Sequence, residues 1–265
     1  GRSLRELRSN PRIVAGFNEH SSLVARELMR HVTTGRIIVS KIATAEIAKL
    51  AENTFRDVNI AFANELAMIC EERKVDVMEV IRIANTHPRV RSIHTPGYGV
   101  GGPCLPKDPY LLLSSSLRRS RPSQILTSRK LNDTMPLHAV EVIERALRED
   151  GKSLFNTRIG VLGVTYKGET DNLRNTPAEP FIKTLLEKRA RVVVYDPHTR
   201  CTFGAQRART LSEAVSCVDC VAVLADHKEF LDDLMACMKS ASCRPILFDG
   251  RRIFDPRAVR SAGFA

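Results

Sequence analysis

One cysteine in this chain lies where it could act as a covalent nucleophile. Cys104 belongs to the segment Gly-Tyr-Gly-Val-Gly-Gly-Pro-Cys-Leu-Pro-Lys-Asp-Pro-Tyr at residues 97–110, whose glycines and prolines disfavour a helix or a strand. Lys107 and Asp108 follow within four residues. A cation near a thiol raises the fraction of reactive thiolate. The segment therefore predicts either a catalytic thiol or a structural turn whose cysteine has no catalytic role.

The same segment contains a pattern that resembles a dinucleotide fingerprint. Its glycines at 97, 99 and 102 match G-x-G-x-x-G. Such a fingerprint has to follow a strand and open a helix. Here a His-Thr-Pro sequence precedes the glycines, and Pro103 and Pro106 follow them. We therefore interpret the loop as unrelated to cofactor binding.

The composition excludes several classes of protein. The 265 residues suffice for one large domain or two ordinary ones, and 43% hydrophobic residues can form a core. Aromatic residues make up only 5% and tryptophan is absent, which argues against the stacking of single-stranded bases. No apolar run approaches the roughly 18 residues of a membrane span. The opening residues contain no signal-peptide h-region and are expected to enter in mid-element.

The cysteines do not suggest a disulfide framework. There are seven of them at irregular spacing, which favours free thiols in a reducing cytoplasm. Cys217 and Cys220 form a lone C-x-x-C without a second pair. Two small buried residues are the favoured interpretation there, and no metal site is expected.

The net charge of +11 favours an anionic partner, either a nucleic acid or a phosphate-bearing small molecule. The arginines are dispersed, and the chain contains no long basic run and no known nucleic-acid-binding module. Much of the charge is therefore expected on an ordinary solvated surface.

The first part of the chain predicts one βαβ unit followed by a long helix. Strands are expected at 12–16 and 36–40, and between them a helix at 21–31 that is capped by Ser21 or Ser22. Apolar residues at helical spacing predict a second helix over 44–73, about 45 Å long. A helix of this length usually connects domains or packs against a second copy.

Further helices are expected before residue 150. They lie at 77–85, at 109–116 and at 126–150, the last with a break at Met135-Pro136, and a basic linker is expected at 118–123. Residues 41–150 are therefore predicted to form a mainly helical block.

From residue 151 strands and helices alternate. Strands are expected at 158–164, 191–195, 218–225 and 245–248, and helices at 177–189 and 211–216. Apolar strands in such an alternation predict a parallel, doubly wound sheet, which binds ligands beyond the carboxyl ends of its strands. The residues expected there are Tyr166, Lys167, Asp196, Asp226, His227, Asp249 and Arg251.

Three segments of the chain resemble the nucleotide-sugar 6-dehydrogenases, the family of UDP-glucose and GDP-mannose dehydrogenases. They are Ala-Glu-Ile-Ala-Lys-Leu-Ala-Glu-Asn at 45–53; Asn-Thr-His-Pro-Arg-Val at 85–90 with Gly-Gly-Pro-Cys-Leu-Pro-Lys-Asp at 101–108; and Gly-Val-Thr-Tyr-Lys-Gly at 163–168 with Asp-Asn-Leu-Arg-Asn-Thr-Pro at 171–177. Tyr-Asp-Pro at 195–197 and Asp-Gly-Arg at 249–251 follow in the order typical of the family. The flanks of these segments are most similar to the UDP-N-acetyl-D-mannosamine dehydrogenase-like branch.

The resemblance implies an NAD-dependent oxidation of the C6 alcohol of a UDP-sugar to a uronate, which serves polysaccharide synthesis. Cys104 stands at the position of the nucleophile that forms a thiohemiacetal and then a thioester. Lys49 matches the residue that stabilises the oxyanion, and Asn53, one helical turn away, matches its amide partner. Without the resemblance, both would be interpreted as ordinary helix surface. Asp108 matches the carboxylate that helps to activate water.

The resemblance also implies a set of residues that bind the UDP-sugar. These residues are Lys107, Tyr166, Lys167, Arg174 and Arg251. Lysine and arginine suit phosphate as a point charge and as a bidentate fork, respectively. Arg252 and Pro103 depart from the residues common at their positions in the family.

The resemblance implies an α/β fold in three parts. Residues 1–40 would be the last part of a Rossmann NAD-binding domain, 41–150 a helical domain with the long connecting helix, and 151–265 a Rossmann-like UDP-sugar domain. The G-x-G-x-x-G turn and a glutamate-bearing loop of the family would precede Gly1, so we expect a C-terminal fragment that alone neither binds NAD tightly nor turns over. The residues that contact NAD stay unknown.

The expected partners are a UDP-sugar and a second copy bound through the 44–73 helix, and neither a nucleic acid nor a membrane. Two other functions compete with the oxidoreductase. One is a non-catalytic module for nucleotide-sugar binding or dimerisation, and the other is a basic nucleic-acid binder.

Overall fold

The structure is a computed structural model that describes residues 3–90, 92–114, 122–240 and 244–264. The chain divides into two compact units. The first comprises Gly1–Phe55 with Asp108–Arg119, and the second Arg56–Lys107 with Ser120–Ala265. Residues 118–121 of the expected basic linker lie outside the described residues. The three-part division at residues 40 and 150 stays a prediction.

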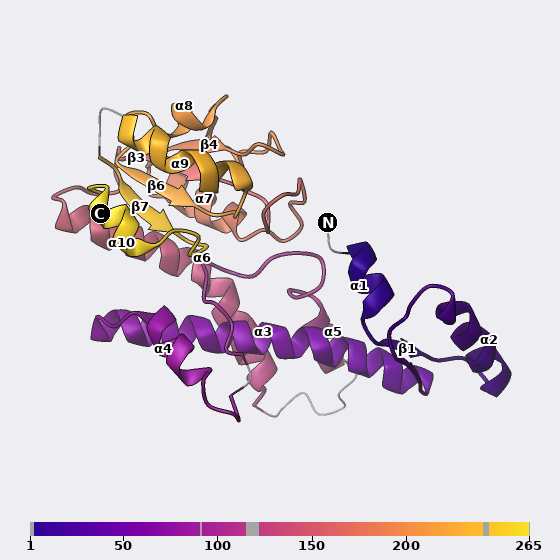
Figure 1. Ribbon diagram of the computed structural model, residues 1–265. Coiled ribbons are helices and arrows are strands. Elements are labelled where there is room, and N and C mark those ends of the chain that lie inside the picture. Colours follow the sequence, from indigo (N-terminus) through magenta and orange to yellow (C-terminus); the bar gives the residue numbers. More distant parts are fainter. Residues whose placement is uncertain (1–2, 91, 115–121, 241–243, 265) are drawn as a thin grey trace. The chain divides into compact units, whose positions relative to one another are not determined.

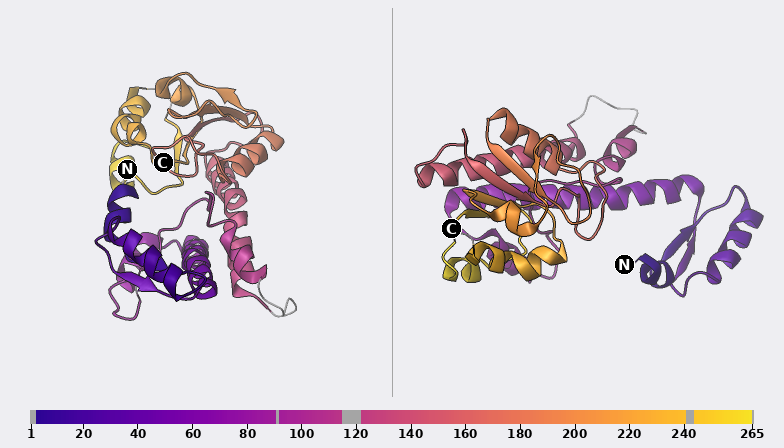
Figure 2. Two further views of the ribbon diagram at one scale, coloured as in Figure 1. Left: turned by 90° about the vertical axis from the view of Figure 1, so that its right-hand side faces the viewer. Right: turned by 90° about the horizontal axis from the view of Figure 1, so that it is seen from above.

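The first unit contains the expected βαβ unit (Figure 2). The helix α1 (Ser3–Ser9) precedes it, and α5 (Asp108–Ser114) also belongs to this unit. The strands β1 (Arg12–Val14) and β2 (Ile37–Val39) pair in parallel around α2 (Glu19–Arg30). The expected cap of α2 was wrong. Asn18 is the N-cap and accepts from the Ser21 N–H at 2.8 Å, while the Ser21 hydroxyl accepts from the Asn18 N–H at 3.0 Å.

The long helix α3 (Ile42–Arg73) confirms the expected helix over 44–73. Its 32 residues correspond to roughly 48 Å. Neither glycine nor proline occurs in it, so nothing local interrupts its backbone hydrogen bonds. Its first turns belong to the first unit and its last turns to the second. In the described residues no helix is both long and apolar enough to cross a membrane.

Two more helices of the second unit precede its sheet. They are α4 (Val77–Ala84), which begins after the capping carboxylate of Asp76, and α6 (Gln124–Glu149). The expected break at Met135-Pro136 was wrong, because α6 continues through Pro136. Proline removes one backbone hydrogen bond from a helix. Both Met135 and Pro136 are buried, and Pro136 lies next to Gly99, so packing outweighs this loss.

The second unit is built on a five-stranded parallel sheet, which confirms the doubly wound prediction. Its strands are β3 (Arg158–Leu162), β4 (Arg191–Tyr195), β5 (Gln206–Arg207), β6 (Cys220–Val223) and β7 (Ile246–Asp249). They follow the order β5-β4-β3-β6-β7. The order therefore reverses between β3 and β6, and the crevice beyond their carboxyl ends is the place where such sheets bind ligands. The short strand β5 was not predicted.

Helices cover both faces of this sheet (Figure 1). One face packs against α6 and α7 (Ala178–Glu187), and the other against α8 (Leu211–Val215), α9 (Lys228–Ser240) and α10 (Pro256–Ser261). Successive strand residues alternate between the two cores, as Val161 and Leu162 show. The helices α9 and α10 were not predicted from the sequence.

Candidate active site

Cys104 lies in a loop, as predicted. Residues 97–107 contain neither helix nor strand, so the glycine pattern lacks the context of a dinucleotide fingerprint. The Cys104 side chain is an exposed free thiol. The Lys107 N–H donates to the Cys104 carbonyl at 2.9 Å and closes a turn behind the thiol. The Lys107 side chain is exposed.

The loop is fixed to the connection between β3 and α7. The Gly102 N–H donates to the Arg174 carbonyl at 2.9 Å, and Asn175 Nδ2 donates to the Gly102 carbonyl at 3.0 Å. A Cβ on Gly101 would lie 2.6 Å from the Asn175 carbonyl oxygen, so only glycine allows this approach. The backbone two residues before Cys104 is therefore held against the segment that carries Tyr166, Lys167 and Arg174.

A ladder of buried polar side chains holds the other end of the loop. Asn64 Oδ1 accepts from the Gly97 N–H, and Asn64 Nδ2 donates to Asn132 Oδ1, both at 2.9 Å. Asn132 Nδ2 donates to Asp57 Oδ1 at 2.9 Å, and Arg129 forms an ion pair with the same carboxylate. All four side chains are buried. This ladder was not predicted from the sequence, although Asp57 and Asn64, seven residues apart in an apolar helix, were a signal for it.

Three of the predicted substrate-binding residues lie at the switch point between β3 and β6. Arg251 donates from Nε to the Leu224 carbonyl at 2.8 Å and from Nη2 to the Tyr166 carbonyl, and its guanidinium lies 5.3 Å from the centre of the Tyr98 ring. Lys167 is exposed, with Nζ 5.6 Å from the centre of the Tyr166 ring. Arg251 thus joins the loops that follow β3 and β6, and the charged end of Lys167 is exposed to solvent.

Arg174 lies on the same connection as Lys167. Its Nε donates to Asn172 Oδ1 at 3.2 Å, and its side chain is exposed. With Cys104 and Lys107 on the docked loop, the second unit therefore carries one nucleophile and several cations near the carboxyl ends of β3 and β6. Such a surface suits a phosphate-bearing ligand.

The first unit brings two predicted catalytic residues together. Asn53 Nδ2 donates to Asp108 Oδ2 at 2.6 Å, and both side chains are buried. Lys49 lies one helical turn before Asn53, is exposed, and forms an ion pair with Glu52 at 3.1 Å. The structure thus pairs the amide with the carboxylate and leaves the lysine on the helix surface.

Among the described residues, the first unit has only part of the arrangement that holds a dinucleotide in a Rossmann fold. The unit β1-α2-β2 supplies only two parallel strands, and no G-x-G-x-x-G follows a strand in the described residues. Dinucleotide binding needs such a turn together with a larger parallel sheet.

One group of side chains has the composition of a metal site. Glu169, His198 and His227 place potential ligand atoms within 4.8 Å of one another. However, Nδ1 of His227 accepts the Glu169 N–H at 3.0 Å, so its lone pair is already used. The group therefore lacks its third free ligand and suits a metal poorly.

The lone C-x-x-C has the environment of structural residues. Cys220 is buried, and burial raises the pKa of its thiol to about 12, which disfavours the thiolate. Cys217 is exposed at a left-handed backbone position with φ of 52°. Neither environment favours redox chemistry or metal binding.

A cavity of about 390 Å³ lies in the second unit between α3, α6, β7 and α10. Glu71, His138 and Arg145 line it, and the Glu71 carboxylate lies 3.1 Å from both His138 Nε2 and Arg145 Nη2. The hydrogen bond to Glu71 raises the pKa of His138, although burial opposes this shift. These three side chains of the cavity wall are therefore already paired with one another.

Comparisons with known proteins place this geometry in a family. Residues 43–134 match the central domain of the UDP-glucose/GDP-mannose dehydrogenase family, and residues 160–256 match its UDP binding domain. The first range contains Cys104, Lys49, Asn53 and Asp108, and the second contains Tyr166, Lys167, Arg174 and Arg251.

Individual relatives agree with this match. The UDP-N-acetyl-D-mannosamine dehydrogenase of Pyrococcus horikoshii is 42% identical over 96% of this chain and 59% of its own length. The NDP-N-acetyl-D-galactosaminuronic acid dehydrogenase of Ralstonia nicotianae is 39% identical over 87% of this chain and 54% of its own length. The chain thus spans less than two thirds of these relatives.

Solved structures are similar over the same extent. The UDP-D-ManNAc dehydrogenase of Pyrococcus horikoshii matches with a TM-score of 0.87 and 42% identity, over 97% of this chain and 59% of that one. The NDP-N-acetyl-D-galactosaminuronic acid dehydrogenase of Methanosarcina mazei matches with a TM-score of 0.86 and 34% identity, over 100% of this chain and 58% of that one. The chain belongs to the UDP-glucose/GDP-mannose dehydrogenase family.

Proposed function

We propose that this chain is the thiol-bearing, nucleotide-sugar-binding part of an NAD-dependent 6-dehydrogenase that acts on UDP-N-acetylmannosamine or a similar UDP-sugar. The docking of the Cys104 loop on the β3–α7 connection carries this proposal, because it joins a free thiol to the segment with Lys167 and Arg174. The names of the relatives support an N-acetylated amino sugar as the substrate.

In this proposal the UDP group binds beyond β3 and β6. Lys167, Arg174 and Lys107 supply the charges for the two phosphates, since their side chains are exposed. Tyr166 and Arg251 shape the floor of the site, because the Arg251 guanidinium is bonded to the Tyr166 carbonyl. NAD would accept the hydrides, and residues other than those described would have to hold it.

Cys104 would act on the C6 aldehyde of the sugar. Its thiolate forms a C–S bond to the carbonyl carbon, and a proton on the carbonyl oxygen completes the thiohemiacetal. Lys49 would stabilise the developing oxyanion. After the second oxidation, water attacks the thioester with Asp108 as base, the C–S bond breaks, and a carboxylate and the free thiol result. The 2.6 Å hydrogen bond from Asn53 would hold the Asp108 carboxylate in place.

We also propose that two copies pair through α3. Phe62 and Ile69, seven residues apart on this helix, are 53% and 50% exposed. A stripe of apolar side chains at this spacing is typical of helix pairing.

The free thiols of the described cysteines are consistent with a reducing, cytoplasmic location.

Alkylation of the thiols tests the proposed site on the chain itself. We would treat the protein with iodoacetamide, with and without saturating UDP-N-acetylmannosamine, and quantify each modified cysteine by peptide mass spectrometry. We expect the nucleotide sugar to slow the alkylation of Cys104 several-fold. Cys217, which is also exposed, is the internal control and should react at an unchanged rate. Equal alkylation of Cys104 with and without the sugar would refute the proposed site.

The same preparation separates the oxidoreductase from a non-catalytic binding module. A module that only holds the nucleotide would bind UDP, measured by calorimetry, without protecting Cys104. Because the described residues do not fit NAD, we expect UDP binding without NADH production by this chain alone.

A further inference from the structure

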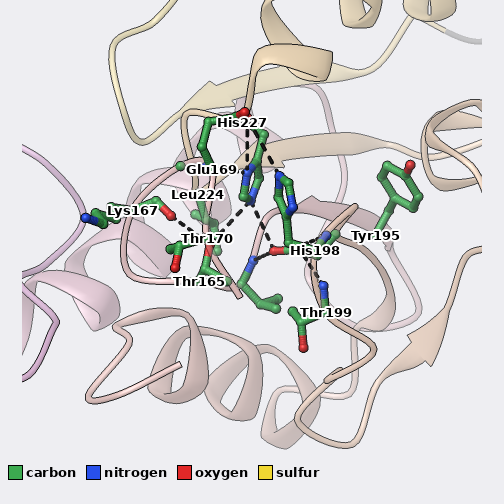
Figure 3. A network of polar contacts seen from close by, with 12 residues as sticks. Thr165, Lys167, Glu169, Thr170, Tyr195, His198, Thr199, Leu224 and His227 are labelled. Carbon is green, nitrogen blue, oxygen red and sulfur yellow. Dashed lines mark hydrogen bonds and ion pairs between the residues drawn. The ribbon is translucent and has the colours of Figure 1, made fainter. Parts of the chain in front are cut away.

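A buried histidine, His227, contacts the loop that follows β3 and the residue that follows β4 (Figure 3). His227 follows β6 and is 0% exposed. Its Nε2 lies 3.3 Å from both Asp196 Oδ2 and the Thr165 hydroxyl, and its Nδ1 lies 3.0 Å from the Glu169 nitrogen. One side chain therefore connects the end of β4 with the loop that follows β3.

The partners of His227 fix which ring nitrogen carries the proton. The Glu169 N–H can only donate, so Nδ1 must accept. The one proton of the Thr165 hydroxyl goes to the Lys167 carbonyl at 2.9 Å, so this hydroxyl has to accept from Nε2. Both contacts require the neutral tautomer with hydrogen on Nε2.

Asp196 also requires a hydrogen on Nε2. It accepts from the N–H groups of Val164 and His198, each at 2.8 Å. Burial opposes the ionisation of Asp196, but hydrogen bonds from His227 and these backbone groups outweigh it and lower the pKa of its carboxyl. An ionised carboxylate accepts only, so Nε2 donates to it.

The network holds a backbone segment that would not keep its shape alone. Glu169 has φ of 56°, in the left-handed region that costs a residue with a side chain free energy. Its N–H bond to His227 and the 2.9 Å bond from the Lys228 N–H to its carboxylate stabilise this conformation. Gly168 before it donates to Asp226 Oδ1 at 2.8 Å. Lys167 stands at the start of this pinned segment.

We infer that His227, held by Asp196 and Thr165, is the positioning residue for residues 167–169, which place the Lys167 ammonium for the diphosphate of a nucleotide ligand. The inference rests on the proposed function, since Lys167 is assigned to the UDP site there. His227 itself is buried and would not touch the ligand. It acts through the Glu169 N–H and, by way of Thr165, through the Lys167 carbonyl (Figure 3).

Two substitutions of His227 separate its two nitrogens. In His227→Asn the amide oxygen can take the place of Nδ1 and accept the Glu169 N–H. In His227→Gln the longer amide reaches toward Asp196 and Thr165 but leaves the Glu169 N–H without its acceptor. We would measure the affinity for UDP by calorimetry on the 265-residue chain. We expect His227→Gln to bind about tenfold more weakly and His227→Asn to stay within about threefold of the original protein.

A double-mutant cycle with Lys167→Ala shows whether His227 acts through this lysine. If it does, His227→Gln weakens UDP binding strongly in the original chain and hardly at all once Lys167 is replaced by alanine. The same tenfold loss in both backgrounds, or equal losses for the two His227 substitutions, would overturn the inference.

Hydrogen exchange of the Glu169 amide, followed by NMR, decides the question without a ligand. We expect faster exchange in His227→Gln than in His227→Asn, and equal rates would overturn the inference. If the original chain fails to bind UDP, the proposed function falls while the exchange rates still test the positioning. Should His227→Gln not fold, Thr165→Val removes the bond to the Lys167 carbonyl at nearly constant volume. Thr165→Val should then weaken UDP binding in the original chain and hardly at all once Lys167 is replaced by alanine. An equal effect in both backgrounds would overturn the inference.

Discussion

Asn53 Nδ2 lies 2.6 Å from Asp108 Oδ2, although the two residues are 55 positions apart in the chain. One is in the long helix α3 and the other is the first residue of α5. Both side chains are buried, so the amide satisfies a carboxylate that water reaches poorly. The pair ties the segment after the cysteine loop to α3.

Removing the amide should destabilise the first unit. In Asn53→Leu the Asp108 carboxylate stays buried without this donor, which should lower the free energy of unfolding by about 1–3 kcal/mol. Glu46→Gln, at an exposed position of the same helix, is the control and should change it by less than about 0.5 kcal/mol. Urea denaturation measures both, and an Asn53→Leu variant as stable as the original would contradict the role of the pair.

Two adjacent arginines should respond differently to replacement by lysine. Arg251 donates to two carbonyls from different loops, a geometry that a single ammonium cannot reproduce. We expect Arg251→Lys to lower the free energy of unfolding by about 1–3 kcal/mol and to weaken UDP binding. Arg252 is exposed, with Asp76 4.0 Å away, so Arg252→Lys should leave stability nearly unchanged. Denaturation and calorimetry measure the effects of both substitutions. Equal effects of Arg251→Lys and Arg252→Lys would contradict this geometry.

The cysteine loop should tolerate a methyl group at one glycine and not at another. A Cβ on Gly101 would press on the Asn175 carbonyl at 2.6 Å, whereas on Gly97 it would lie 3.4 Å from the Gly250 carbonyl. We expect Gly101→Ala to cost about 1–3 kcal/mol in unfolding free energy and Gly97→Ala clearly less. Thermal denaturation of the two variants side by side checks this order, and the reverse order would show that the loop docks differently.

The pair of Glu71 and His138 should make stability depend on pH. The hydrogen bond to Glu71 raises the pKa of His138 in the folded state. The resulting stabilisation is complete below the unfolded value, near pH 6.5, and is lost as the pH rises through the folded value. His138→Gln should therefore cost on the order of 1 kcal/mol at pH 5.5 and less at pH 8.5.

Glu71→Gln is the control for this pH dependence. Burial of Glu71 opposes its ionisation, but hydrogen bonds from His138 and Arg145 outweigh it and lower the pKa, so the carboxylate stays charged between pH 5.5 and 8.5. In the Glu71→Gln background the cost of His138→Gln should no longer fall as the pH rises, because the hydrogen bond that raises the pKa of His138 is gone. Urea titrations at both pH values would disprove the pair if the cost of His138→Gln grew with pH.

A charge on the exposed stripe of α3 should prevent the proposed pairing of two copies. We expect the chain to sediment at twice 29.6 kDa and Phe62→Glu to sediment as a single copy. Phe155 is 57% exposed outside this helix, so Phe155→Glu is the matched control and should still pair. Sedimentation velocity would reject the α3 interface if Phe62→Glu remained paired.

Local patterns predicted most of the elements and the family resemblance predicted the candidate residues. The parallel sheet follows from apolar strands alternating with helices, and α3 follows from thirty apolar-periodic residues without a breaker. The resemblance named Asn53 and Asp108 as candidate residues, and their catalytic roles stay a prediction. Their 2.6 Å separation is a tertiary fact that no local pattern contains.

Two predictions about helices were wrong for different physical reasons. α6 passes through Pro136 because Met135 and Pro136 are both buried, and this tertiary packing outweighs the lost hydrogen bond. Asn18 caps α2 because it and Ser21 form a capping box with two reciprocal hydrogen bonds, whereas the sequence predicted Ser21 or Ser22 as the cap. His227 lies at the carboxyl edge of the sheet, as expected, but no local pattern contains its bonds to Glu169 and Asp196, which are 58 and 31 positions away.

The buried ladder of Asn64, Asn132, Asp57 and Arg129 has a consequence for how this region can change during evolution. Each amide in it serves two partners at once, so replacing one leaves a donor or an acceptor stranded in the core. A single substitution is therefore selected against, whereas a matched double substitution is not. Positions 64 and 132, 68 residues apart, should consequently vary together among relatives while the apolar residues around them drift independently.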